Sequence, residues 1–257
     1  MTDKVVVEAS FYEIYNEKVR DLLSSSSSSS SSSNGSQKVS CRVRENPSVG
    51  PYVEGLSQVS VKSADELLAL LDKGNRNRSV AATRMNEHSS RSHSIFTIVL
   101  KIGKREQGDA KVGKISLVDL AGSERVGHAG TSGQRLKEGA KINQSLTALG
   151  LVIKALVDQQ QSATTRNNTK KNHHHHHIPY RDSILTWLLK ESLGGNAKTI
   201  MLATVNPLEQ YSDESLSTLR YASQAKCIIN NAVVNEDPKS KLIRGIHIYL
   251  FEIKVTF

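Results

Sequence analysis

Residues 114–124, KISLVDLAGSE, join an apolar run to an acidic residue and a glycine. The apolar run is typical of a strand, so Asp119 is expected at the strand's end and Gly122 in the turn that follows. An aspartate at that place can hold the water shell of Mg²⁺. A glycine lets the backbone come close to a terminal phosphate and donate an amide hydrogen bond. By itself, the Asp-x-x-Gly pattern is a weak signal, and an ordinary strand-ending turn is the commoner explanation.

A second polar motif lies upstream, where residues 86–93 read NEHSSRSH. Its hydroxyls, amide and guanidinium stand immediately ahead of HSIFTIVLKI, a run that predicts a strand starting at His93. The polar link GKREQGDAKVG joins this strand to that of KISLVDL. The composition of the motif suits a loop that senses phosphate, although a polar turn has the same composition.

One string imitates a phosphate-binding loop. Residues 108–114 satisfy GxxxxGK, but Ile115 stands where a magnesium-binding Ser or Thr is required. The string also leads into a strand, whereas a phosphate-binding loop opens a helix whose amides face the phosphates. We therefore exclude this string as a nucleotide-binding loop.

The first part of the chain has strand and helix patterns in turn. Residues 4–15 predict a strand, KVRDLL after them a short helical turn, and residues 38–62 short extended pieces. Ser63 and Glu66 form a capping box, which predicts the start of a helix.

The second part continues this alternation. Apolar residues at three- and four-residue steps predict a helix from about 134 to 157. A further helix is expected between a cap at Asp182 and Gly194, then a buried strand at 199–205 and a helix at 212–226. The whole pattern predicts an α/β fold with a central sheet flanked by helices.

Two polar segments interrupt these patterns and are expected to be solvated insertions. Residues 24–38 begin with ten consecutive serines, and residues 159–177 end with five consecutive histidines. The histidines could bind a metal, but low complexity accounts for them more simply.

The composition limits the class of protein. The 257 residues contain 34 Lys and Arg against 25 Asp and Glu, a formal charge of +9, which favours an acidic partner. The two cysteines, Cys41 and Cys227, are far apart and lack CxxC spacing, so we expect neither a disulfide scaffold nor a cysteine zinc site. No run has the length of a membrane span and no signal peptide is recognisable, so we expect no membrane insertion.

The pair NEHSSRSH and LVDLAGSE resembles the switch I and switch II signatures of the kinesin motor domain. The likeness continues through SFYEIYNEKVRDLL, RLKEGAKINQSLTALG, IPYRDSILTWLLKESLGGN and STLRYASQAK, and RVRENPSVGPYVEGL is most similar to the kinesin-3 branch. The resemblance implies a P-loop NTPase-like fold, in which residues 1–237 form a partial motor domain. Residues 238–257 would be a neck-region remnant or an aberrant tail.

The resemblance implies ATP and Mg²⁺ as ligands. Ser89, Ser90 and Gly122 would contact the terminal phosphate. Ser90 would also meet Mg²⁺, and Asp119 would hold the metal through a bound water. Asn86 would help to hold the closed loop around the nucleotide.

The resemblance also implies the catalytic groups. Arg91 would pair with Glu124, which joins the two switches and lets Glu124 help to relay the proton of the attacking water. The implied catalytic residues are Ser89, Arg91, Gly122 and Glu124.

The acidic partner implied by the resemblance is the microtubule, which places the protein in the cytoplasm and on the cytoskeleton. Basic side chains on the switch II helix and nearby loops are the implied contacts: Arg135, Lys137, Lys141, Lys170, Lys171 and Arg181. Gln144 and Ile184 stand where many kinesins have lysines, which should weaken this contact.

The implied function is a microtubule motor that couples ATP hydrolysis to movement. A complete motor carries its phosphate-binding loop and first strands ahead of residues 4–15, so we expect an N-terminally truncated motor domain with impaired ATPase activity and an open sheet edge. The rival hypothesis is a non-catalytic microtubule-binding or interaction module. A nucleic-acid binder rests on charge alone and lacks a recognised fold signature, so nucleic acid is not an expected partner.

Overall fold

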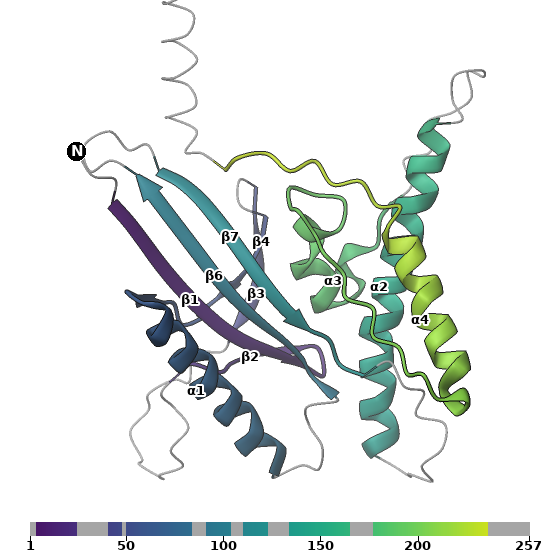
Figure 1. The fold of residues 1–257 in the computed structure, drawn as a ribbon, viewed down its shortest axis with the longest axis horizontal. Helices are drawn as coiled ribbons and strands as arrows, with labels where there is room; N and C mark the ends of the chain where they lie inside the picture. Colours follow the sequence, from purple (N-terminus) through teal and green to yellow (C-terminus); the bar gives the residue numbers. More distant parts are fainter. Residues whose placement is uncertain are drawn as a thin grey trace, which may run out of the picture.

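The computed structural model describes residues 4–24, 41–47, 50–83, 91–103, 110–122, 134–164 and 177–235. The elements of these ranges are shown in Figure 1. The strands are β1 (Lys4–Tyr15), β2 (Lys18–Asp21), β3 (Arg42–Asn46), β4 (Gly50–Glu54), β5 (Val59–Val61), β6 (His93–Gly103) and β7 (Ala110–Asp119). The helices are α1 (Ala64–Thr83), α2 (Gln134–Thr164), α3 (Ile184–Leu188) and α4 (Ser212–Ala225), with short 3₁₀ turns at Tyr180–Asp182, Lys190–Ser192 and Glu209–Tyr211.

The main sheet has the order β2-β1-β6-β7, and β5 also pairs with β1. Every pairing in it is antiparallel, including the long hairpin of β6 and β7. β3 and β4 form a separate two-stranded hairpin. Because β7 ends the order, its outer edge pairs with no further strand in the part of the chain that the structure describes, although the Val112 amide near its start donates to the Asn235 carbonyl.

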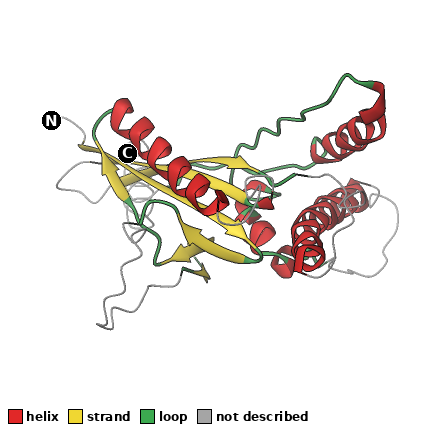
Figure 2. Cartoon of the chain, turned by 90° about the horizontal axis from the view of Figure 1, so that it is seen from below, coloured by secondary structure: helices red, strands yellow, loops and turns green. Residues whose placement is uncertain are grey.

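The alternation of side chains along β1 divides the core into two layers. Phe11 faces a cluster completed by Phe96 and by leucines of α1, and its ring meets that of Phe96 edge to face at 5.4 Å. The next residue, Tyr12, faces the other cluster, which α2 and α3 complete. Helices therefore lie on both sides of the sheet, as Figure 2 shows, and the predicted α/β class is confirmed.

The predicted start of α1 is confirmed by its hydrogen bonds. The Ser63 hydroxyl accepts from the Glu66 amide at 3.2 Å, and the Glu66 carboxylate accepts from the Lys62 amide at 2.7 Å. The first bond satisfies an amide of the first helical turn, and the second satisfies the amide of the residue that precedes the cap. No helix among the described residues is long and apolar enough to cross a bilayer.

The helical turn predicted for KVRDLL is wrong, because this stretch contains β2. Asn16 and Glu17 both have positive φ values, 53° and 55°, and form the tight turn that folds β2 back on β1. Such two-residue hairpin turns favour Asn-Gly, so glutamate at the second place hid the signal.

The strand predicted at 199–205 is also wrong. These residues form no strand, and Ile200 and Leu202 are 88% and 85% exposed. A strand needs a neighbour for its backbone amides and carbonyls, and no described strand pairs with this run.

Two helix boundaries differ from expectation. α2 continues to Thr164, so the predicted insertion at 159–177 begins within this helix. α3 is capped by Ser183, whose hydroxyl accepts from the Leu185 amide at 3.0 Å, and the predicted cap, Asp182, lies in the preceding 3₁₀ turn. Apart from Ser24, the predicted serine-rich insertion lies outside the described residues.

The open edge of β7 should promote self-association, because unpaired strand edges template pairing with other chains. Leu117 of β7 is 56% exposed. We expect Leu117→Lys to lower the concentration-dependent light scattering of the purified chain. Leu68→Lys on α1 is the control, since Leu68 is 58% exposed but lies away from the edge. An equal effect of both changes would assign the association to exposed apolar area in general.

Candidate functional site

The described ends of the two sequence motifs, residues 91–93 and 117–122, lie at one end of the β6–β7 hairpin. Ser94, near the start of β6, pairs with Asp119, the last residue of β7. Arg91 precedes β6 and Gly122 follows β7, so both motifs leave the sheet at the same end. The antiparallel register thus places the ends of the two predicted switch motifs next to each other.

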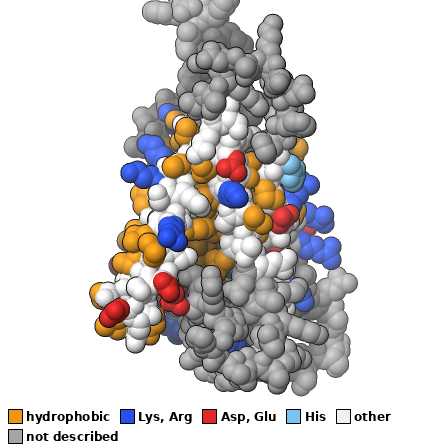
Figure 3. All heavy atoms as spheres, turned by 90° about the vertical axis from the view of Figure 1, so that its right-hand side faces the viewer, with side chains coloured by type: hydrophobic (Ala, Val, Ile, Leu, Met, Phe, Trp, Pro, Cys, Tyr) orange, Lys and Arg blue, Asp and Glu red, His pale blue; other side chains and the backbone are white. Residues whose placement is uncertain are grey.

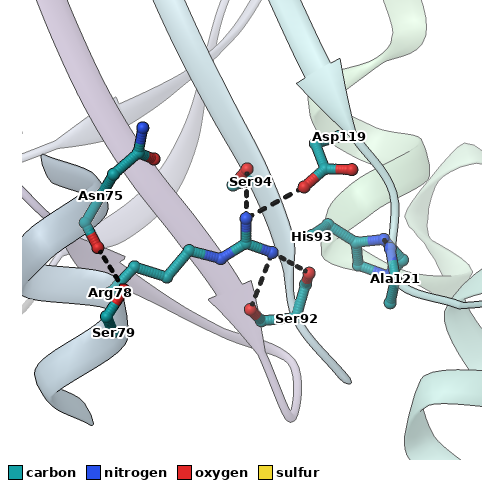
Figure 4. A network of polar contacts seen from close by, with 8 residues as sticks. All are labelled: Asn75, Arg78, Ser79, Ser92, His93, Ser94, Asp119 and Ala121. Carbon is teal, nitrogen blue, oxygen red and sulfur yellow. Dashed lines mark hydrogen bonds and ion pairs between the residues drawn. The ribbon is translucent and has the colours of Figure 1, made fainter. Parts of the chain in front are cut away.

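Arg78 of α1 bridges these strand ends (Figure 4). Its guanidinium donates to the Asp119 carboxylate at 2.9 Å and to the Ser94 hydroxyl at 3.1 Å. It also donates to the backbone oxygen of Ser92 at 2.9 Å. The Arg78 side chain is 12% exposed, so helix, β6 and β7 are held together by a mostly buried cation.

Sequence reasoning missed Arg78, although a signal for it exists. Leu67, Leu71 and Gly74 follow a helical spacing along the side of α1 that packs on the sheet. Arg78 stands four residues after Gly74 and continues this stripe. A charge on the buried side of a helix needs a paired acceptor, which Asp119 supplies.

Asp119 has the chemistry expected of a residue that holds hydrated Mg²⁺. Its side chain is 68% exposed, and its Oδ2 atom takes the Arg78 bond. Exposed carboxylate oxygen is the type of donor that Mg²⁺ prefers, directly or through water. The carboxylate therefore fits the metal role implied by the sequence, with Arg78 fixing its orientation.

His93 lies on the opposite face of β6 and reaches two other segments. Its Nδ1 atom accepts from the Ala121 amide at 2.9 Å, and its Nε2 atom is 2.8 Å from the Ser145 hydroxyl of α2. The residue is 3% exposed. Burial lowers the pKa of His93 to about 4 from an ordinary 6.5; the charge of Asp119 raises it and that of Arg78 lowers it further.

This pKa predicts a pH dependence of folding. The folded state favours neutral His93, so the stabilisation is complete above pH 6.5 and is lost as the pH falls from 6.5 towards 4. Over that window, the unfolding free energy of the wild type should fall more steeply than that of His93→Asn, by up to about 1.4 kcal/mol per pH unit. Urea unfolding at pH 7, 6 and 5 measures the difference. His177→Asn, at an exposed histidine, should follow the wild type, and parallel curves for His93→Asn would contradict the prediction.

Several predicted site residues lie outside the described part of the chain. Four belong to the phosphate and catalytic set, namely Asn86, Ser89, Ser90 and Glu124, and two belong to the microtubule set, namely Lys170 and Lys171. The backbone of Arg135, Lys137 and Lys141 lies in α2, as predicted for the switch II helix, and their side chains are not described.

The predicted microtubule contact Arg181 lies in a small charge cluster. Its guanidinium donates to Glu45 of β3, which also accepts from Lys190 at 2.7 Å, and it lies 5.3 Å from the ring centroid of Trp187. The hydrogen bonds from Lys190 and Arg181 lower the pKa of Glu45 to about 2. The Arg181 side chain is still 72% exposed, and its contact with a microtubule stays a prediction.

The segment after α4 lies along the loop that follows α3, and hydrogen bonds of Asn230 hold the two together. The Asn230 amide donates to the Ala197 carbonyl at 2.8 Å and its oxygen accepts from the Gly194 amide at 2.7 Å. Further on, the Asn235 carbonyl accepts from the Val112 amide of β7 at 3.0 Å. The segment is thus docked from Asn230 to the start of β7's outer edge.

Comparison with known families gives a match over most of the chain. The family model of the kinesin motor domain matches residues 1–228. Mouse kinesin-like protein KIF13A is 52% identical over 244 residues, and Caenorhabditis elegans kinesin-like protein unc-104 is 51% identical over 246 residues. The alignments cover 93% and 94% of this chain but only 13% and 14% of those relatives.

Solved structures agree with the family model. A KIF14 dimer in the two-heads-bound state, with AMP-PNP and in complex with a microtubule, matches with a TM-score of 0.76 and 50% identity. That match covers 95% of this chain and 64% of the solved chain. A fast kinesin matches with a TM-score of 0.73 and 44% identity, over 92% of this chain and 60% of its own. The chain belongs to the kinesin motor domain family, and its relatives KIF13A and unc-104 are members of the kinesin-3 branch.

Proposed function

We propose that this chain is the switch-bearing part of a microtubule motor that couples ATP hydrolysis to movement along microtubules. The observation that supports the proposal is that the described ends of the two motifs lie together at one end of the β6–β7 hairpin, where Arg78 bridges Ser94 and Asp119. Motors of this type act by ordering loops around a terminal phosphate and passing the change to a distant surface. The location that follows is the cytoplasm, on microtubules.

The residues of the two switch motifs have different roles in binding and sensing the nucleotide. Ser89 and the Gly122 amide bind the terminal phosphate, while Asn86 closes the loop over it. Ser90 and Asp119 hold Mg²⁺, which neutralises charge on the phosphates when it is bound. Arg91 and Glu124 join the switches and orient the attacking water, which is positioning and electrostatic work.

We assign the contact with the microtubule to α2 and the neighbouring loops. Its basic residues are Arg135, Lys137, Lys141, Lys170, Lys171 and Arg181. The side of the molecule that carries α4 displays hydrophobic side chains among scattered charges (Figure 3). Leu216 and Leu219 of α4 are 46% and 52% exposed. A basic surface with apolar neighbours suits the acidic surface of tubulin. The docked segment 230–235 provides the element whose release and docking bias a step.

The test measures the binding of nucleotide and the binding of microtubules separately. Binding of a fluorescent ATP analogue with Mg²⁺, ATP turnover with and without microtubules, and microtubule cosedimentation are each measured on the full chain. We expect Mg²⁺-dependent binding and microtubule-stimulated turnover. Glu124→Ala should abolish turnover and leave binding in place, because Glu124 acts on the attacking water. Arg76→Ala, a change at an exposed residue of α1, should alter neither.

The rival function is a non-catalytic microtubule-binding module. It is favoured by one observation, namely that the 257 residues contain no GxxxxGK[ST] string. Saturable cosedimentation with microtubules, without any binding of the ATP analogue, would favour this rival. Absence of both activities would reject both proposals.

A further inference from the structure

A buried hydrogen-bond chain connects three parts of the fold that are distant in sequence. His93 begins β6, Ala121 follows β7, and Ser145 lies within α2. The three residues are 3%, 4% and 2% exposed. The His93 side chain therefore ties the turn after β7 to α2.

The direction of each bond follows from its partners. The Ala121 amide can only donate, so the Nδ1 atom of His93 accepts and carries no proton. In a neutral imidazole the proton then lies on Nε2, which donates to the Ser145 hydroxyl. The ring is fixed in one tautomer and one orientation by a bond at each nitrogen. A shift at either partner must therefore break a buried bond or move the ring.

The two residues at the ends of this hydrogen-bond chain, Ala121 and Ser145, lie beside residues with different proposed tasks. Ala121 is the residue before Gly122, whose amide is the proposed phosphate contact. Ser145 lies four residues after Lys141, on the helix proposed to contact the microtubule. We propose that His93 is a positioning residue that couples the Ala121–Gly122 turn to α2. The tasks of its two ends rest on the proposed function, but the coupling itself does not.

The packing around His93 makes this coupling stiff. The ring lies on the face of the sheet that carries Ile14, the residue paired with His93 across β1 and β6. On the same face, Leu149 and Val152 of α2 are almost fully buried against the sheet. A packed interior of this kind transmits displacement because it holds few voids.

The first experiment tests the coupling without nucleotide. Amide hydrogen exchange is measured by NMR at Ala121 in the wild type and in Ser145→Ala. Ser145 contacts the Nε2 atom of His93, whose Nδ1 atom accepts from the Ala121 amide, so the proposed coupling predicts that a change at Ser145 reaches Ala121. We expect exchange at Ala121 to accelerate about tenfold, the change produced by losing about 1.4 kcal/mol of local stability. Ser162→Ala is the matched control, since Ser162 lies on the same helix and donates only to the Asp158 carbonyl.

Two substitutions at His93 separate its two bonds. Asparagine places an acceptor near the Nδ1 position, and glutamine places a polar atom near the Nε2 position. We expect His93→Asn to protect the Ala121 amide while removing its response to Ser145→Ala. His93→Gln should lose protection of Ala121 outright. If Ser145→Ala leaves exchange at Ala121 unchanged in the wild type while the protein melts normally, the proposed coupling is rejected.

A functional measurement distinguishes failure of this inference from failure of the proposed function. The factor by which microtubules change the affinity for the ATP analogue is compared between the wild type and Ser145→Ala. We expect this factor to shrink at least threefold. A wild type that binds no nucleotide would reject the proposed function, and the exchange experiment would still decide the coupling. Normal coupling of nucleotide and microtubule in Ser145→Ala, with unchanged exchange, would reject the inference alone.

Discussion

Replacing Arg78 with alanine is expected to lower the unfolding free energy by about 2 kcal/mol and to weaken Mg²⁺-dependent binding of an ATP analogue about tenfold. The stability loss arises because Ser94 and the fully buried Ser92 each lose a charged hydrogen-bond donor. The exposed Asp119 contributes little to it, since water can replace its partner. The binding loss arises because the Asp119 carboxylate is no longer oriented at the strand end.

Urea unfolding and fluorescence titration measure the two effects of Arg78→Ala. Arg76→Ala is the matched control, an exposed arginine on the same helix, and should change stability by less than about 0.5 kcal/mol. Arg78→Lys should recover part of the stability and little of the binding, because a lysine cannot contact Asp119, Ser94 and Ser92 together. Equal nucleotide binding in Arg78→Ala and Arg76→Ala would show that Arg78 has no part in the site.

Gly74→Ala is expected to lower the unfolding free energy by about 2 kcal/mol, although alanine is the better helix former by about 1 kcal/mol. A Cβ atom at Gly74 would lie 2.1 Å from Cδ1 of Phe11. Phe11 is 3% exposed and packs edge to face on Phe96, so its ring has little room to move. Overpacking a close-packed core costs about 1–3 kcal/mol and here exceeds the helix gain.

Another helical glycine provides the opposite control. A Cβ atom at Gly150 of α2 would make its nearest contact at 3.7 Å, with Tyr221, which is ordinary van der Waals distance. We therefore expect Gly150→Ala to raise the unfolding free energy by about 0.5–1 kcal/mol. In thermal or urea unfolding the two variants should shift in opposite directions. The added change Phe11→Leu should recover part of the loss in Gly74→Ala, and its failure to do so would place the clash elsewhere.

The hairpin that carries the site could be predicted from pattern alone. The apolar runs before and after the polar link predicted β6 and β7, including the start at His93 and the end at Asp119. β7 begins at Ala110, however, so residues 110–113, predicted as part of the polar link, belong to the strand. The capping box fixed the start of α1. These predictions succeeded because strand runs and helix caps depend on residues that are close in sequence.

Other features could not be predicted because their causes lie elsewhere in the chain. Glu17 adopts a positive φ, which the sequence does not suggest, and its carboxylate accepts from the Ile184 amide at the start of α3 at 2.7 Å. The run 199–205 has the composition of a strand but forms none beside the described strands. In the first case a contact with the distant start of α3 accompanies the local conformation. In the second case the run pairs with none of the described strands.

By itself, the sequence determined the α/β class, the two switch motifs and their attachment to strand ends, because each depends on a short run of residues. Only the tertiary structure decided which side chains meet. Arg78 reaches Asp119 across 41 residues, His93 reaches Ser145 across 52, and Arg181 reaches Glu45 across 136. Strand register and helix packing set such pairs, and local propensity carries no information about either.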